Sequence, residues 1–83
     1  MLPSDALRLL FPPPGAVLSA DGPVTIRAMG GSRPLTFLVD GAPLPVERVR
    51  REAAWLPPGP GFYRITVLDA DGSAAHAAVQ VKP

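Results

Sequence analysis

The sequence contains no cysteine and only one histidine, His76. Without cysteine no disulfide can stabilise the fold, which fits either a cytoplasmic protein or an exported module whose sheets bury enough apolar surface. A zinc site needs several ligands of suitable type, so we expect His76 to be an outward strand residue. The sequence therefore predicts no metal site and no cofactor.

An excess of charge and long apolar runs are missing as well. Eight basic and seven acidic residues give a formal net charge of +1, which is too balanced for a nucleic-acid surface. No stretch approaches the roughly 20 apolar residues of a membrane span. The N-terminus, Met1–Asp5, lacks the basic start and apolar run of a signal peptide. If the domain works outside the cytoplasm, we expect it to be a piece of a longer exported protein.

Catalytic motifs do not occur in the sequence. The serines fall in turns or at the terminus, the only lysine is the penultimate residue Lys82, and neither Ser-x-x-Lys nor Gly-x-Ser-x-Gly is found. The acidic residues fall mostly in turns and in one charged loop, which does not favour the paired carboxylates of a glycosidase. No glycine-rich phosphate loop joins a strand to a helix. We therefore expect a chain without catalytic activity of its own.

Proline and glycine are abundant, with 12 and 8 residues in a chain of 83. Long helices do not survive that spacing, because proline removes an amide donor and clashes with the preceding turn. The apolar residues make up 47% of the chain and alternate with polar ones, which favours folded β structure over disorder.

Short segments with period-2 alternation, separated by turn signals, predict about seven short strands. The predicted segments are Leu7–Phe11, Ala16–Leu18 as a short continuation on the other sheet, Pro23–Ala28, Leu35–Val39, Ala42–Val46, Ala53–Leu56, Phe62–Leu68 and Ala75–Val81. The side chains predicted to face inward are Val24, Ile26 and Ala28; Tyr63, Ile65 and Val67; and Ala75, Ala77, Val79 and Val81. Leu7, Leu9 and Phe11 are predicted to share one face of their strand. The fold expected is all-β, an immunoglobulin-like two-sheet antiparallel β-sandwich. Residues 1–6 are expected to be a flexible N-terminal segment and residues 7–83 a single domain.

Two turns carry specific predictions. Asp40-Gly41 favours positive φ at a two-residue hairpin turn, and the prolines of Ala42–Val46 make that segment an edge strand. Asp69-Ala70-Asp71-Gly72 resembles the opening of a calcium loop, but no glutamate lies downstream. We expect a hairpin turn in which the aspartate side chains bond local amides.

The candidate binding residues are few. Trp55 is either a core residue or a platform that stacks on a sugar ring. The basic residues Arg48, Arg50 and Arg51 form either a solvated loop or a binding patch, since Glu47 and Glu52 bracket them. Tyr63 lies where immunoglobulin-like sandwiches place a tyrosine corner, so its hydroxyl is expected to bond a nearby backbone group.

Several segments together carry a family resemblance. They are Phe11-Pro12 with Gly15-Ala16, the Phe37–Leu44 hairpin, Trp55-Leu56-Pro57, and the run from Gly61 to Gly72. In this order and spacing they resemble the C-terminal domain of the penicillin-binding protein 1C family, from about Leu7 to Val81. One departure is Phe37, which stands where that family is expected to have tryptophan; phenylalanine fills the same space without the indole donor.

The resemblance implies a periplasmic location, as part of a membrane-anchored bifunctional peptidoglycan glycosyltransferase and transpeptidase whose catalytic residues lie in other domains. The chain would be a non-catalytic accessory module that positions the enzyme or docks a periplasmic partner. The partners implied are other domains of the parent enzyme, a periplasmic protein, or peptidoglycan itself. Two alternatives remain open. One is a carbohydrate-binding module for glycan strands, motivated by Trp55 and the arginine loop; the other is an immunoglobulin-like spacer of a surface protein.

Overall fold

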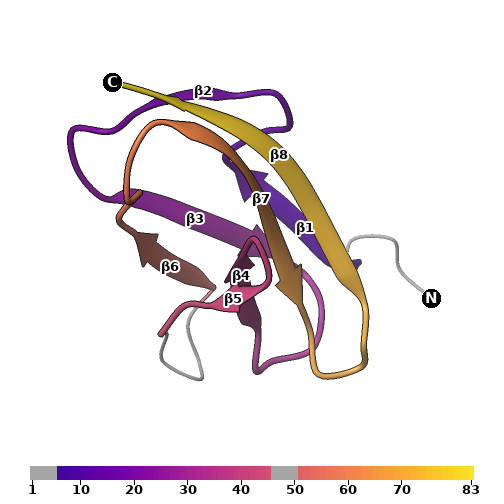
Figure 1. Cartoon of the computed structure of the whole chain (residues 1–83). Helices are drawn as coiled ribbons and strands as arrows, with labels where there is room; N and C mark the ends of the chain where they lie inside the picture. The colour runs from indigo at the N-terminus through magenta and orange to yellow at the C-terminus, as the bar shows by residue number, and fades with distance from the viewer. Residues whose placement is uncertain (1–5, 46–50) are drawn as a thin grey trace.

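The computed structural model describes residues 6–45 and 51–83. It is an all-β sandwich of two sheets, as the alternation predicts (Figure 1). The predicted flexible segment falls almost wholly on residues 1–5, which lie outside the described residues. The strands are β1 (Arg8–Phe11), β2 (Val17–Ser19), β3 (Val24–Met29), β4 (Thr36–Val39), β5 (Ala42–Pro43), β6 (Glu52–Trp55), β7 (Gly61–Leu68) and β8 (Ala74–Lys82).

The two sheets enclose one core. A three-stranded sheet has the order β1-β3-β6, and a five-stranded sheet has the order β2-β8-β7-β4-β5. Both contribute apolar side chains from alternate positions, because successive residues of a strand point to opposite faces. The buried apolar residues are Val24, Ile26 and Ala28; Leu35, Phe37 and Val39; Ala53 and Trp55; Ile65 and Val67; and Ala77, Val79 and Val81. The predicted inward faces of β3, β7 and β8 are thereby confirmed.

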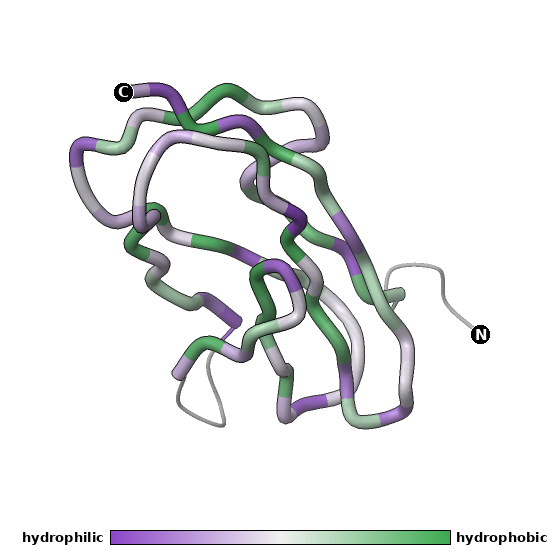
Figure 2. The backbone as a smooth tube through the Cα atoms, viewed as in Figure 1, coloured by the Kyte–Doolittle hydropathy of each residue, from purple (hydrophilic) through white to green (hydrophobic). Residues whose placement is uncertain are grey.

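The hairpin of β7 and β8 is the longest element of the fold. Its register runs without interruption from Gly61 opposite Val81 to Leu68 opposite Ala74. Figure 2 shows hydrophilic residues gathered at the turns and hydrophobic ones recurring along the strands. A strand with one buried and one solvated face requires this pattern.

The chain crosses between the sheets after β1. β2 pairs with β8, in the sheet opposite β1, which confirms the predicted continuation of the chain on the other sheet. The pairing is parallel, so the antiparallel arrangement expected of the sandwich does not hold at this edge, although it holds for the other strand pairs of the described structure. The reason is that the proline-rich segment 12–14 shifts the chain sideways without reversing its direction.

The turn after β4 has the backbone that its sequence predicts. Asp40 and Gly41 have φ values of 50° and 84°, and Val39 pairs with Ala42. β5 lies at the sheet edge, as expected, but covers only Ala42–Pro43. The predicted strand ran to Val46, which lies outside the described residues. The prolines shorten the strand, since proline has no N–H to donate to a ladder.

Candidate functional site

A β-bulge in β1 changes which side chains reach the surface. Leu9 pairs with Ala28, but Phe11 rather than Leu10 pairs with Arg27. An extra residue in one strand shifts the inward–outward alternation by one position. The prediction that Leu9 and Phe11 share one face was therefore wrong: Phe11 is 42% exposed and pairs with the outward-facing Arg27.

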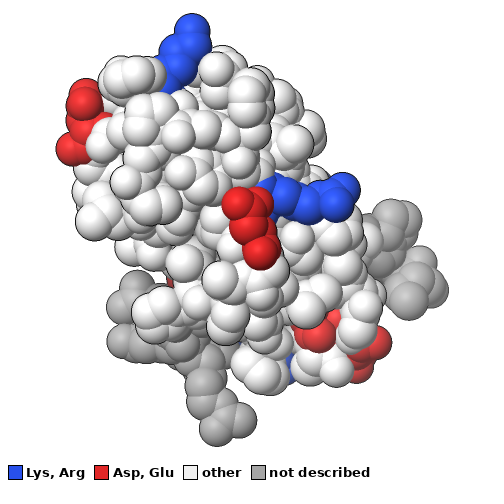
Figure 3. Space-filling model, in the orientation of Figure 1, with Lys and Arg blue, Asp and Glu red and all other residues white. Residues whose placement is uncertain are grey.

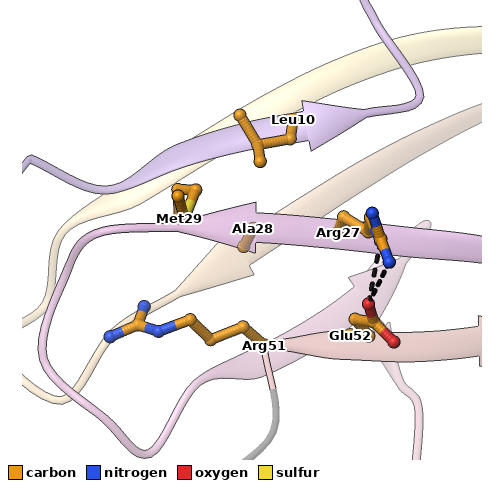
Figure 4. Close-up of a pocket in the computed structure, with 6 residues that line it drawn as sticks. All are labelled: Leu10, Arg27, Ala28, Met29, Arg51 and Glu52. Atoms are coloured by element: carbon orange, nitrogen blue, oxygen red, sulfur yellow. Dashed lines mark hydrogen bonds and ion pairs between the residues drawn. The ribbon is translucent and has the colours of Figure 1, made fainter.

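The bulge creates an apolar cluster on the outer face of the three-stranded sheet. Leu10, Phe11 and Met29 are 47%, 42% and 46% exposed, and we call these three residues the outer apolar patch. Leu10 and Met29 line an open depression of about 250 Å³ with Arg27, Ala28, Arg51 and Glu52. In Figure 4 Leu10, on β1, faces the gap between Met29 and Arg27 on β3. The depression is shallow and open, which suits contact with another surface better than enclosure of a small molecule.

Charged side chains border this depression. Arg27 on β3 forms an ion pair of 2.7 Å with Glu52 on β6, and its Nε donates to the same carboxylate at 2.8 Å (Figure 4). Arg51 extends away from that pair and donates a hydrogen bond to the carbonyl oxygen of Gly30. The sheet thus presents an apolar centre with a partly neutralised basic border.

The arginine loop is only partly within the described structure. Arg51 lies at the depression, whereas Arg48 and Arg50 lie outside the described residues. Glu52, expected in the charged loop, instead begins β6 opposite Arg27. The ion pair across the two strands accounts for this position, because oppositely charged residues facing each other stabilise a sheet.

Trp55 does not lie beside Arg51. Its side chain points into the sandwich and is 5% exposed, and its ring meets that of Tyr63 edge-on at 5.0 Å between centroids. It lines a separate apolar depression of about 250 Å³, together with Val39, Asp40, Ala42, Pro43, Leu44, Pro58 and Tyr63. Of its two interpretations, core residue and sugar-stacking platform, the burial supports the first. Phe37 is also fully buried.

Tyr63 forms the predicted tyrosine corner. Its hydroxyl donates a hydrogen bond of 2.7 Å to the carbonyl oxygen of Gly59, four residues upstream. This bond ties the segment between β6 and β7 to the start of β7, where the two sheets meet. The residue is therefore structural, which agrees with its interpretation as core.

The loop between β7 and β8 is closed by Asp69. Its Oδ1 accepts hydrogen bonds from the backbone N–H groups of Asp71 and Ser73, as expected for a turn. Its Oδ2 accepts one from the N–H of Ser32, in the loop between β3 and β4. These bonds hold the pKa of Asp69 below its ordinary value of 3.8, and the bond from Ser32 lowers it most. Desolvation of the carboxylate acts in the opposite direction. Within residues 6–45 and 51–83, no group of three or more possible metal ligands is found.

The outer face of the five-stranded sheet carries residues that the sequence did not single out. Phe62 on β7 is 79% exposed, the most of the exposed large apolar side chains in the described structure. His76 on β8 is exposed, as predicted, and its Nδ1 lies 3.0 Å from the Thr66 Oγ1. The alternation around Tyr63 already placed Phe62 outward. Sequence alone gave no reason to separate it from other surface residues.

The topology and the closed core define a small fibronectin III-like β-sandwich module. The fibronectin(III)-like modules of CbhA from Clostridium thermocellum match it with a TM-score of 0.65 and 27% identity, over 90% of this chain and 92% of that one. The Bacteroides ovatus protein SGBP-B, solved with a mixed-linkage heptasaccharide, matches with a TM-score of 0.63 and 16% identity. That likeness covers 95% of this chain but 24% of SGBP-B, and shows the fold alone.

The family of the chain follows from its sequence. The chain belongs to the penicillin-binding protein C-terminus family, whose model matches residues 2–81. No curated protein sequence matches the chain. Family membership makes it an accessory module of a penicillin-binding protein, and a small all-β module fits a non-catalytic part of such a protein. Among residues 6–45 and 51–83 there is no helix of the length and hydropathy that crossing a membrane requires.

Proposed function

We propose that this module docks against the catalytic part of its own penicillin-binding protein and positions it in the periplasm, without taking part in catalysis. The observation that carries the proposal is the bulge that leaves both Leu10 and Phe11 exposed on the face that also carries Met29. A sandwich strand normally presents polar residues to solvent, so the extra residue exposes apolar surface that a regular strand would bury.

The composition of the patch supports a protein partner. Exposed apolar surface with a polar border is typical of interaction sites. Methionine, aromatic residues and arginine are enriched at protein interfaces, whereas lysine and glutamate are depleted. The outer apolar patch combines Met29 and Phe11 with the neighbouring Arg27 and Arg51.

The position of the patch supports the catalytic part as the partner. The family is defined at the C-terminus of penicillin-binding proteins, so the catalytic part would join the module before β1. β1 supplies two of the three patch residues, and a domain joined there would reach this face first. Among the described residues the face is also basic, since Arg8, Arg27 and Arg51 lie there with one acid, Glu52. An acidic surface on the catalytic part would complement it.

The test is a binding titration between the 83-residue chain and the parent protein lacking this module. We expect saturable binding that weakens at least roughly tenfold in Leu10→Ser and in Met29→Ser, as central interface residues commonly do. Val17→Ser is the matched control, because Val17 is 57% exposed but lies on the other sheet. Absence of binding, or equal weakening in the control, would refute the docking role and leave that of a spacer.

A further inference from the structure

We infer that the outer face of β7 and β8 binds a glycan strand that bears carboxylate groups. The residues that make this surface, called the glycan face below, are Phe62, Arg64, Gln80 and Lys82. It lies on the five-stranded sheet, opposite the sheet that carries the outer apolar patch. The inference is therefore independent of the docking function.

The strand register brings an aromatic ring and an amide together. Phe62 pairs directly with Gln80, and Gln80 pairs on its other side with Val17 of β2. Paired residues point to the same face, so Phe62 and Gln80 are neighbours there. The amide of Gln80 supplies both donors and an acceptor, which suits the hydroxyl and acetamido groups of a sugar. The ring of Phe62 gives an apolar surface on which the C–H face of a sugar can stack.

Two cations lie on either side of this pair. Arg64 is two residues beyond Phe62 on β7, and Lys82 is two residues beyond Gln80 on β8, at the opposite end. Neither forms an ion pair with a residue of the described structure. The nearest acid along the sheet is Asp40, whose Oδ1 accepts the backbone N–H of Arg64 at 2.8 Å. The outward positions of β2, β7 and β8, which the structure describes in full, include no acidic residue. Asp40 at the end of β4 offsets part of the charge of Arg64, and Lys82 leaves the face with an excess of positive charge that complements an anionic ligand.

The shape of the face suits an extended chain. β7 and β8 pair over eight successive positions, which at about 3.4 Å per residue gives a long track. The residue opposite Arg64 is Ala78, and the one opposite Leu68 is Ala74, so the outward side chains of β8 are small at these points. Figure 3 shows that much of this side of the molecule is uncharged, with its charged side chains in small separate groups.

A protein partner fits this face less well than the other sheet. Gln80 separates Phe62 from the exposed Val17, so these two do not form a contiguous apolar patch. A single aromatic ring among amide, cationic and small side chains instead has the composition of a sugar-binding surface: a stacking ring with polar groups that fix orientation.

Co-sedimentation of the 83-residue chain with purified peptidoglycan sacculi tests the inference. We expect the chain to sediment, with its affinity lowered roughly fivefold to tenfold in Phe62→Ala, since an exposed ring that makes one stacking contact contributes on that scale. Arg64→Gln should weaken binding several-fold, and binding should also weaken as salt is raised, because surface charges are screened. Chitin, an N-acetylated glycan without carboxylates on its chain, should retain less of the 83-residue chain than sacculi do.

Leu56→Ala is the matched control, because Leu56 is an apolar residue whose side chain is 66% exposed. It follows β6 of the other sheet and lies off this face. The variant should bind sacculi like the unchanged chain. No retention on sacculi, or unchanged retention in both Phe62→Ala and Arg64→Gln, would overturn the inference. Equal retention on chitin would overturn the carboxylate requirement. The assay contains no catalytic domain, so its failure is distinct from failure of the docking proposal.

Discussion

The carboxylate of Asp69 accepts a hydrogen bond of 3.1 Å from the backbone N–H of Ser32, which lies 37 residues earlier in the chain. The two loops are joined a second time, where the N–H of Ala70 donates to the carbonyl oxygen of Ser32 at 2.8 Å. The Ser32 hydroxyl also donates to Asp71 at 2.6 Å. Asp69 thus fastens the loop between β3 and β4, which links the two sheets, to the β7–β8 hairpin.

Asp69→Asn should lower the melting temperature, because the amide loses the charge that strengthens three backbone hydrogen bonds and one of its two positions becomes a donor. The pKa of Asp69 is lowered in the folded state from 3.8. Its stabilising contribution is therefore fully present well above that pH, and is lost as the pH falls through 3.8 toward the lower folded value. Thermal unfolding followed between pH 7 and roughly pH 3 measures this.

Asp71→Asn provides the comparison for that series. Asp71 lies in the same turn, but its side chain accepts a bond from the exposed Ser32 hydroxyl and none of the three backbone bonds. We expect a smaller loss of stability at neutral pH. If both variants lose stability equally and with the same pH dependence, Asp69 has no special role.

Gly31→Ala should destabilise the fold by more than roughly 2 kcal/mol, because strain and a steric clash add. Gly31 has a φ of 72°, and an added Cβ would lie 2.9 Å from Leu7 Cδ1 and 3.0 Å from Asp69 Oδ2. Gly41→Ala is the control, since Gly41 has a φ of 84° with no atom within 4 Å of the added Cβ. The free energy of unfolding of this variant should fall by only about 1 kcal/mol, because alanine is strained in the left-handed backbone conformation. Urea unfolding of both variants gives the difference, and equal losses would rule out the clash.

Tyr63→Phe should lower the free energy of unfolding by about 1 kcal/mol, the usual loss when one intramolecular hydrogen bond is removed. The bond concerned is that from the Tyr63 hydroxyl to the Gly59 carbonyl oxygen. The ring keeps its edge-on contact with Trp55, so the packing is retained. Chemical denaturation measures the change, and a variant as stable as the original would show that water replaces the bond at no cost.

Phe37→Trp tests the residue expected to be tryptophan in the related family. Phe37 is completely buried, so the larger indole must displace its neighbours, and overpacking of this kind costs about 1–3 kcal/mol. Phe37→Ala should cost more, about 3–5 kcal/mol, because it leaves a cavity. Urea unfolding of both variants compares their free energies of unfolding. A tryptophan variant more stable than the original chain would show that the core holds unfilled space at this position.

Local pattern in the sequence was sufficient for much of the fold. Period-2 alternation gave the inward faces of β3, β7 and β8, because a sheet with one buried face requires it. Asp40-Gly41 predicted the hairpin turn, and Tyr63, two residues after Gly61 near the start of the long strand, predicted the tyrosine corner. Each of these depends on residues a few positions apart, so the sequence contains the whole interaction.

Both candidate surfaces needed the strand pairing. Alternation placed Phe11 on the same face as Leu9, but the bulge against β3 turned it outward beside Arg27, and a bulge is a property of two strands together. Trp55 and the arginines are close in sequence, yet Trp55 is buried between the sheets and Arg51 lies on the outer depression. Phe62 became a candidate only when its register placed Gln80 beside it.

The sequence by itself determined that this chain is an all-β module of the penicillin-binding protein C-terminus family, since short-range alternation, turn residues and motif order are all local properties. The tertiary structure alone decided which apolar residues remain exposed and which loops are joined. The bond between Asp69 and Ser32 and the exposure of Leu10, Phe11 and Met29 depend on segments far apart in the chain. Such contacts exist only once the two sheets have closed over their common core.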